Sequence, residues 1–167
     1  KINENETNES SLFWADQLAE KVIERAHNEK TIANIKCQQT PSGGKHIGNL
    51  NDVIRSYFVY KSVIEKGEKC TFVHTTDDRD PLKDVPAKVA DLNANWHSIE
   101  KFPEMKNYLG VPLCNVPDPF GCCKSWSEHF TKVWMMGVNE LEMHPVLYSV
   151  NDLYNQGKFM PYVNMVF

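Results

Sequence analysis

The most constraining feature of this sequence is a glycine-rich turn between two strongly patterned segments. Residues 31–38 (TIANIKCQ) have the β-branched content and rough alternation of a strand, and they lead into the Pro-Ser-Gly-Gly turn at 41–44. After this turn, apolar residues recur at three- and four-residue steps from Ile47 to Ile64, and Gly67 is well placed to end a helix. The pattern predicts a strand, a tight turn and a long helix.

Later segments extend this pattern to an α/β fold. Residues 69–75 (KCTFVHT) are a second apolar run, suited to parallel pairing with the first strand because a long helix separates the two. A capping box at Ser125 and Glu128 predicts another helix, which we expect to end at Gly137, and residues 141–150 predict a third strand. Alternating strands and helices predict a parallel sheet.

Other segments lack this alternation of strands and helices. Residues 14–26 predict an amphipathic helix, and a cap at residues 149–152 predicts one more short helix. Residues 77–123 hold six of the nine prolines and predict a loop-rich insertion. Residues 1–12 carry few apolar side chains, and we expect them to be a disordered leader.

Composition excludes several classes of protein. A net charge of −4 lacks the broad basic surface of a protein that coats nucleic acid, so DNA is not an expected partner. No apolar run approaches the roughly 20 residues of a membrane-spanning helix, so a membrane is not expected either. The N-terminus also lacks the basic and apolar blocks of a signal peptide, so a cytoplasmic location is expected. The five cysteines are odd in number and scattered, which favours reduced thiols or metal ligands.

The glycine turn has the features of a phosphate site. Gly43 and Gly44 permit close backbone approach, and the helix start after them offers free N–H groups and a favourable dipole. His46 and Asn49 are three residues apart, so they project on one side and suit hydrogen bonds to phosphate oxygens. A simple glycine turn with a helix-capping histidine is the alternative interpretation.

Four separated blocks resemble one family. The first, TPSGGKHIGN at 40–49, resembles the His-Ile-Gly-His signature of class I aminoacyl-tRNA synthetases, and its His-Ile-Gly-Asn form is similar to that of the mainly archaeal class I lysyl-tRNA synthetases. FWAD at 13–16, HTTDDRDPLKDVP at 74–86 and YLGVPLCNVPDPFGCCKSWSEHF at 108–130 resemble further blocks of that family, in the same order.

This resemblance implies a fold and an activity. Residues 13–167 would form the first half of a Rossmann-like class I catalytic domain, with a loop-rich insertion at about 77–123. The activity would be activation of lysine with ATP, with Mg²⁺ expected beside it, followed by ligation to tRNA(Lys).

The resemblance also implies roles for residues of the turn. His46 and Asn49 would be catalytic, holding the ATP phosphates in the transition state, within a larger ATP-binding set: Thr40, Ser42, Gly43, Gly44, His46, Gly48 and Asn49. Thr40 would also contact lysine, with Asp77 or Asp78 pairing with a substrate ammonium group. A solvated acidic turn is the alternative for these two aspartates.

Two departures from the family pattern matter. Gln38 stands where the family usually has glycine, at a position that bears on amino-acid specificity. The second class I signature, of the Lys-Met-Ser-Lys-Ser type, is absent from the sequence. The chain is therefore expected to be a truncated part of the enzyme, with weak ATP binding and poor turnover on its own.

Cys122, Cys123 and His129 form a candidate zinc site. Zn²⁺ takes four nitrogen or sulfur ligands, and Cys114 and His97 are available nearby in the sequence. Because the spacing is irregular, small buried core cysteines are the alternative.

Two functions from other classes remain open. A small adenylyltransferase, such as the phosphopantetheine enzyme, has a related histidine motif and about this chain length, although its usual Phe-Asp-Pro lead is missing here. A non-catalytic module that binds ATP, lysine or another protein is the second.

Overall fold

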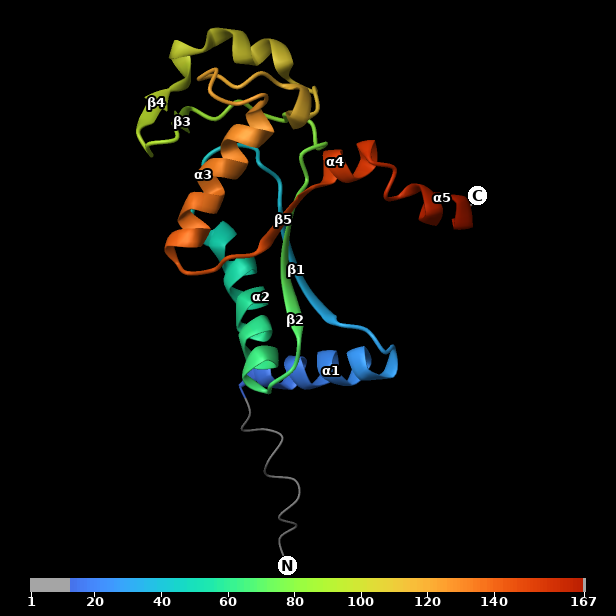
Figure 1. Cartoon of the computed structure of the whole chain (residues 1–167). Coiled ribbons are helices and arrows are strands. Elements are labelled where there is room, and N and C mark those ends of the chain that lie inside the picture. The colour runs from blue at the N-terminus through green and yellow to red at the C-terminus, as the bar shows by residue number, and fades with distance from the viewer. Residues whose placement is uncertain (1–12, 167) are drawn as a thin grey trace, which may run out of the picture.

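A parallel sheet lies at the centre of the computed structural model, which describes residues 13–166 (Figure 1). Its strands are β1 (Ala33–Gln39), β2 (Cys70–Thr76) and β5 (Val146–Ser149), in the order β1-β2-β5. β1 and β2 pair in parallel along their full lengths, and β5 pairs in parallel with the second half of β2. The α/β fold with a parallel sheet is therefore confirmed.

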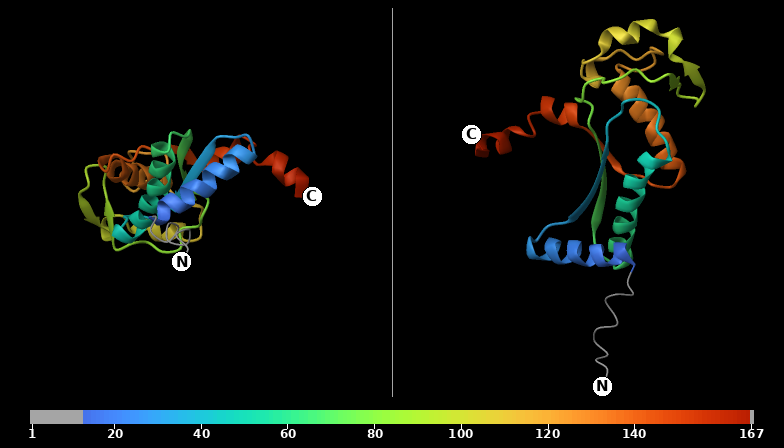
Figure 2. Two further views of the ribbon diagram at one scale, coloured as in Figure 1. Left: turned by 90° about the horizontal axis from the view of Figure 1, so that it is seen from below. Right: turned by 180° about the vertical axis from the view of Figure 1, so that it is seen from behind.

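The helices that connect these strands cover one face of the sheet. α2 (Ile47–Glu65) and α3 (Trp126–Glu140) lie on the same side (Figures 1 and 2). Their buried side chains meet the strands in an apolar cluster that we call the sheet core: Cys37, Val53, Phe72, Trp134, Val138 and Met143. α1 (Trp14–Asn28) packs against α2, where the Ser62 hydroxyl donates to Asp16 at 2.5 Å.

The insertion between β2 and α3 has a core of its own. It contains an antiparallel hairpin of β3 (Lys88–Ala90) and β4 (Trp96–Ser98), followed by the 3-10 helices η2 (Ile99–Lys101), η3 (Pro103–Tyr108) and η4 (Leu113–Asn115). Its buried side chains pack against two from the first turns of α3, and together they form the insertion core: Leu82, Val89, Met105, Leu113 and Val116 with Trp126 and Phe130 of α3. The segment is irregular, as predicted, yet well packed.

Two element ends differ from the prediction. α3 continues past Gly137 because the next residue, Val138, is buried in the sheet core and holds the last turn in place. β5 begins only at Val146, because the chain leaves α3 through Glu142, whose φ of 57° is incompatible with a strand. The first part of the apolar run at 141–150 is thus the exit of a helix.

The C-terminal segment leaves the sheet as two short helices. Ser149 caps α4 (Val150–Asn155) by accepting a hydrogen bond from the Asp152 amide at 3.0 Å, as its spacing predicted. α5 (Met160–Val166) extends away from the sheet and exposes most of its apolar side chains (Figure 1).

The leader expected at residues 1–12 lies outside the described residues, so the division at residue 12 stays a prediction. Within residues 13–166, no helix has the length and apolarity needed to cross a membrane.

Candidate functional site

His46 and Asn49 form a reciprocal capping box at the start of α2. His46 is the N-cap residue, and its Nδ1 accepts a hydrogen bond from the Gly48 amide at 3.1 Å. In return, the Asn49 Oδ1 accepts one from the His46 amide at 3.1 Å. The box lies just beyond the carboxyl end of β1, which is the edge where open α/β sheets bind their ligands.

The capping bond also assigns the proton of the His46 imidazole. A neutral imidazole carries a single proton, and Nδ1 is used here as an acceptor. The proton therefore sits on Nε2, on a side chain that is exposed. The capping role considered from the sequence is present, and the same geometry leaves an N–H donor beside the positive end of the α2 dipole.

Hydrogen bonds fix the conformation of the loop between β1 and α2. The Thr40 hydroxyl donates to Asp80 Oδ2 at 3.0 Å, and the Lys45 ammonium donates to the Thr40 carbonyl at 2.5 Å. Burial lowers the pKa of Lys45. A cavity of 430 Å³ opens beside this loop, and its walls include four of the predicted ATP-binding residues: Thr40, Ser42, Gly43 and Gly44.

Protein side chains closely approach two glycines of the expected ATP-binding set. A Cβ at Gly48 would lie 2.9 Å from the His46 imidazole, and one at Gly44 would lie 2.4 Å from Trp96 Cη2. The missing side chains at these positions therefore accommodate the chain's own imidazole and indole rings.

The two aspartates after β2 differ in their surroundings. Asp78 is buried, and its carboxylate accepts hydrogen bonds from the Ser149 hydroxyl at 2.5 Å and the Asn151 amide at 2.8 Å. It thereby joins the end of β2 to the end of β5 and the start of α4. The Asp77 carboxylate makes no hydrogen bond or ion pair within residues 13–166, and burial together with the nearby Asp80 charge raises its pKa. Asp77 is thus the aspartate with a carboxylate still available.

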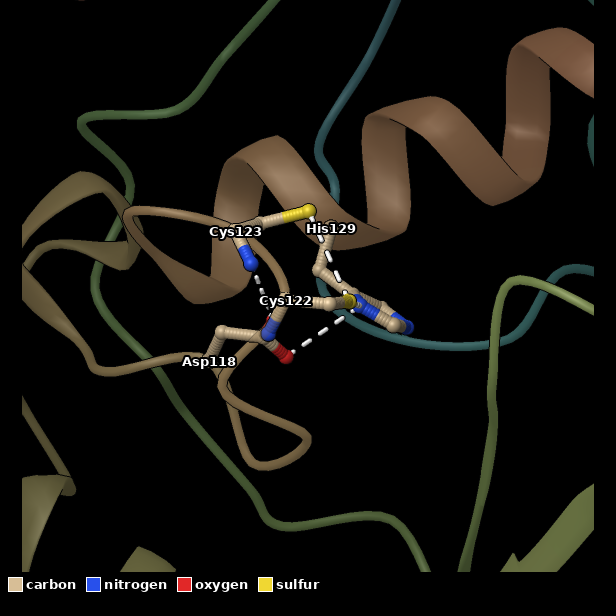
Figure 3. Close-up of side chains that lie close together, drawn as sticks. All are labelled: Asp118, Cys122, Cys123 and His129. Carbon is tan, nitrogen blue, oxygen red and sulfur yellow. Dashed lines mark hydrogen bonds and ion pairs between the residues drawn. The ribbon is translucent and has the colours of Figure 1, made fainter.

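The structure brings the three predicted metal ligands together (Figure 3). Ligand atoms of Cys122, Cys123, His129 and a fourth residue, Asp118, all lie within 4.8 Å of one another. The Asp118 carboxylate also organises the loop, since it accepts hydrogen bonds from the amides of residues 120, 122 and 123 at 3.0, 2.8 and 2.7 Å. We call this group the Cys-His cluster.

The two ring nitrogens of His129 have different partners. Nε2 lies 2.9 Å from the Ala90 carbonyl oxygen, which only accepts, so Nε2 carries a proton. Nδ1 faces Asp118 Oδ1 at 3.1 Å and Cys122 Sγ at 3.3 Å. An imidazole lone pair beside a carboxylate needs a cation between them, either a proton on Nδ1 or a metal ion. This orientation, fixed by a backbone carbonyl, is typical of metal-binding histidines.

Sequence reasoning missed one member of the cluster and included two residues that lie elsewhere. His97 pairs with Asp91 at 3.0 Å, and Cys114 contacts Asn115, so neither belongs to the Cys-His cluster. Asp118 lies within the block at 108–130 that resembles the family, but it was not predicted as a ligand. Its position between two prolines, before a glycine, was the available signal for a carboxylate that organises a turn.

Comparisons with known proteins agree with the resemblance found in the sequence. Residues 12–167 match the family model described as tRNA synthetases class I (K). Curated lysine–tRNA ligases from Natronomonas pharaonis, Halobacterium salinarum and Pyrococcus horikoshii are 37%, 36% and 32% identical over 155, 150 and 157 residues. These matches cover 92%, 89% and 93% of this chain but 28%, 27% and 27% of the relatives, so the chain spans about a quarter of their length. The chain belongs to the class I (K) family of tRNA synthetases.

Proposed function

We propose that this chain supplies the ATP-binding part of a lysine–tRNA ligase. In the first step, a lysine carboxylate oxygen attacks the α-phosphorus of ATP, the bond to the bridging oxygen breaks, and pyrophosphate leaves with that electron pair. In the second step, a ribose hydroxyl of tRNA(Lys) attacks the lysyl carbonyl of the adenylate, and AMP leaves. Lysine, ATP with Mg²⁺ and tRNA(Lys) are then the ligands of the whole enzyme, which we expect to work in the cytoplasm.

The capping box at the start of α2 is the observation that carries this proposal. Asn49 uses its carbonyl oxygen within the box, so its amide N–H groups remain for a ligand, as does the Nε2–H of His46. Donors beside a helix N-terminus favour phosphate oxygens, and they lower the barrier when charge grows on those oxygens. Both side chains are thus suited to the phosphates during attack on the α-phosphorus.

We propose that lysine is recognised at the other end of the glycine loop, where β1 ends. Thr40 and Asp77 are near in the fold, since the Asp77 amide donates to the carbonyl of Gln39 at 2.9 Å. The free carboxylate of Asp77 suits an ammonium group, whereas that of Asp78 is already surrounded by donors. We therefore assign substrate binding to Asp77 and the joining of strand ends to Asp78.

Lysine-dependent exchange of pyrophosphate into ATP, measured on the full-length protein, tests the proposal. We expect His46→Ala to lower the exchange rate by roughly 10²–10³-fold, as the loss of one transition-state donor does. His144→Ala, which removes another exposed histidine, is the control and should leave the rate unchanged. ATP affinity should change much less than the rate; equal losses would indicate uniform binding of ATP and not transition-state stabilisation.

The same measurement separates the alternative functions. A small adenylyltransferase would exchange pyrophosphate only when given its own acceptor, such as phosphopantetheine, and would not respond to lysine. A non-catalytic module would bind ATP or lysine without exchange. Either result would overturn the assignment to lysine activation. The isolated chain should bind ATP weakly in a calorimetric titration, because the capping box lies wholly within it.

We also propose that the Cys-His cluster holds Zn²⁺. Two thiols, an imidazole and a carboxylate are all ligands that Zn²⁺ takes, and the Asp118 and His129 side chains are fully buried. When bound, the ion would stabilise the insertion and would not take part in the reaction. Metal analysis of the purified protein should find one zinc per chain, and Cys123→Ser should lower that content. Cys114→Ser is the matched control, because Cys114 lies outside the cluster.

A further inference from the structure

The hairpin of the insertion reaches the glycine loop that ends in His46. Trp96, the first residue of β4, places its six-membered ring against Gly44, where a Cβ would lie 2.4 Å from Cη2 and 2.8 Å from Cζ3. Cβ atoms in folded proteins essentially never lie this close to another heavy atom. Gly44 is not among the residues with positive φ, so its backbone would accept alanine. The indole of Trp96 is therefore what keeps a side chain out of position 44.

The insertion contacts this loop at two further places. A Cβ at Gly43 would lie 3.2 Å from Pro86 Cγ, and the φ of Gly43 is 146°. The Asp80 carboxylate accepts the hydrogen bond from Thr40 at 3.0 Å. The loop is thus held from the insertion side by an aspartate, a proline and a tryptophan in succession.

The hairpin that carries Trp96 is itself firmly built. Asp91 accepts hydrogen bonds from the amides of Asn93 and Asn95 at 2.8 and 2.9 Å, and it pairs with His97 at 3.0 Å. On the other strand, the Ala90 carbonyl accepts from His129 Nε2 at 2.9 Å, which links β3 to the Cys-His cluster. Trp96 is nevertheless 58% exposed, so burial of the indole alone does not account for its position.

We infer that Trp96 is a positioning residue: by packing on Gly44 it fixes the loop that presents the His46–Asn49 capping box to ATP. The inference rests on the proposed role of His46 and adds a residue from the insertion to it. The path from the ring to the box is short, because residues 44 and 46 are separated only by Lys45, whose ammonium is bonded back to Thr40. Without the indole, the loop should sample other conformations, in which the two hydrogen bonds of the capping box are broken.

Amide hydrogen exchange, measured by NMR on the isolated chain, tests this without any ligand. Trp96→Ala should speed exchange of the His46 and Gly48 amides, the two that bond within the box, by about tenfold, as a local opening would. Exchange at Phe72 in the sheet core should not change. Lys88→Ala, an exposed change on the same hairpin, is the matched control and should leave all these rates as they are.

A double-mutant cycle makes the test specific to the contact. Gly44→Ala alone should also speed exchange, because its methyl group collides with the indole. In a Trp96→Ala chain the same methyl group meets no ring, so Gly44→Ala should have no further effect. Trp96→Phe should behave like Trp96→Ala, because the ring atoms that reach Gly44 are those that phenylalanine lacks. Additive effects in the cycle would overturn the inference.

Activity of the full-length protein provides the functional readout. Trp96→Ala should lower kcat for lysine activation several-fold and leave the KM for lysine unchanged, because the box acts on the phosphates. If the effects of Trp96→Ala and Gly44→Ala on amide hydrogen exchange are not additive but the protein does not bind ATP, the proposed function is refuted and the positioning role is retained. If the protein binds ATP but the two effects on amide hydrogen exchange are additive, the positioning role is refuted and the proposed function is retained.

Discussion

The sheet and the insertion are stabilised in different ways. The sheet core is a continuous set of apolar side chains from β1, β2, α2 and α3. The insertion has short strands and 3-10 helices, and two of its loops are each organised around one aspartate, Asp91 or Asp118, whose carboxylate accepts several hydrogen bonds. Regular elements satisfy their own backbone groups, whereas irregular chain needs side-chain acceptors to do so.

α3 joins these two regions. Its first turns contribute Trp126 and Phe130 to the insertion core, and its later turns contribute Trp134 and Val138 to the sheet core. Because α3 is shared, we expect the two regions to unfold as one cooperative unit. We also expect cavities, acid and the loss of hydrogen-bond acceptors to affect the stability of the two regions differently.

Trp126→Ala should have the largest effect on stability. The indole is fully buried in the insertion core, and its removal should lower the free energy of unfolding by about 3–5 kcal/mol. Urea unfolding followed by far-ultraviolet circular dichroism measures this. Because α3 is shared, the sheet should unfold in the same transition. Trp14→Ala, on α1, is the control with a partly exposed indole. A separate early transition for the insertion would show that the two cores are independent.

Acid should weaken the sheet before it weakens the insertion. Burial lowers the pKa of His74, in the middle of β2, from 6.5 to about 4, and its Nδ1 lies 3.1 Å from the Cys37 thiol. The folded state holds His74 neutral, so its contribution is complete above pH 6.5 and is lost as the pH falls toward 4, by about 3 kcal/mol in all.

The insertion responds at lower pH. Burial alone would raise the pKa of Asp118, but the hydrogen bonds from residues 120–123 outweigh it and lower the pKa below 3.8. That contribution is present above pH 3.8 and is lost only below it. Urea unfolding midpoints at pH 7, 5.5 and 4.5 test whether the contribution of His74 is lost before that of Asp118. His74→Gln should flatten the pH dependence and His144→Gln should not; an unchanged slope in His74→Gln would contradict the assignment.

Asp118→Ala should destabilise the insertion through lost acceptors. The carboxylate accepts hydrogen bonds from three backbone amides, and leaving these partly buried donors without their acceptor should cost about 2 kcal/mol. The measurement is urea unfolding in buffer with a chelator, so that metal binding does not contribute. Asp84→Ala, an exposed aspartate of the same insertion, should change the midpoint little. Equal effects of the two variants would argue against the organising role of Asp118.

Gly137→Ala should give the smallest effect, with the opposite sign. Gly137 is exposed within α3, and apart from its chain neighbours and the nearby helix backbone no atom lies within 4 Å of the Cβ that alanine would add. Alanine favours the helix over glycine, so the free energy of unfolding should rise by roughly 0.5–1 kcal/mol. Thermal unfolding measures the shift. A loss of stability would mean that the junction between the two cores needs a flexible residue there.

The sequence was sufficient to predict the elements whose patterns are local. β1, α2 and β2 were predicted within one or two residues, because apolar periodicity and Gly67 mark them clearly. The extension of α3 past Gly137 was not predictable, since it depends on Val138 reaching a core made by distant strands. The β3–β4 hairpin was missed because three-residue strands are too short to show a period.

The candidate site divides in the same way. The spacing of His46 and Asn49 predicted that their side chains share one side of a helix start, and the structure shows them in one capping box. Their roles toward ATP, and those of Thr40 and Asp77, stay predictions. The contact of Trp96 with Gly44 joins residues that no local motif connects.

The order in which the strands pair also predicts the order in which parts of the sheet fold during synthesis. Contacts between β1 and β2, such as Cys37 with His74, span 37 residues, whereas the bond between the Asp78 carboxylate and the start of α4 spans 73. Shorter loops close at a lower entropic cost, and chain emerging from a ribosome makes its early contacts first. The β1-α2-β2 unit should therefore form while the insertion is still being synthesised. β5 joins last, so during synthesis one edge of β2 waits for a partner that has not yet emerged.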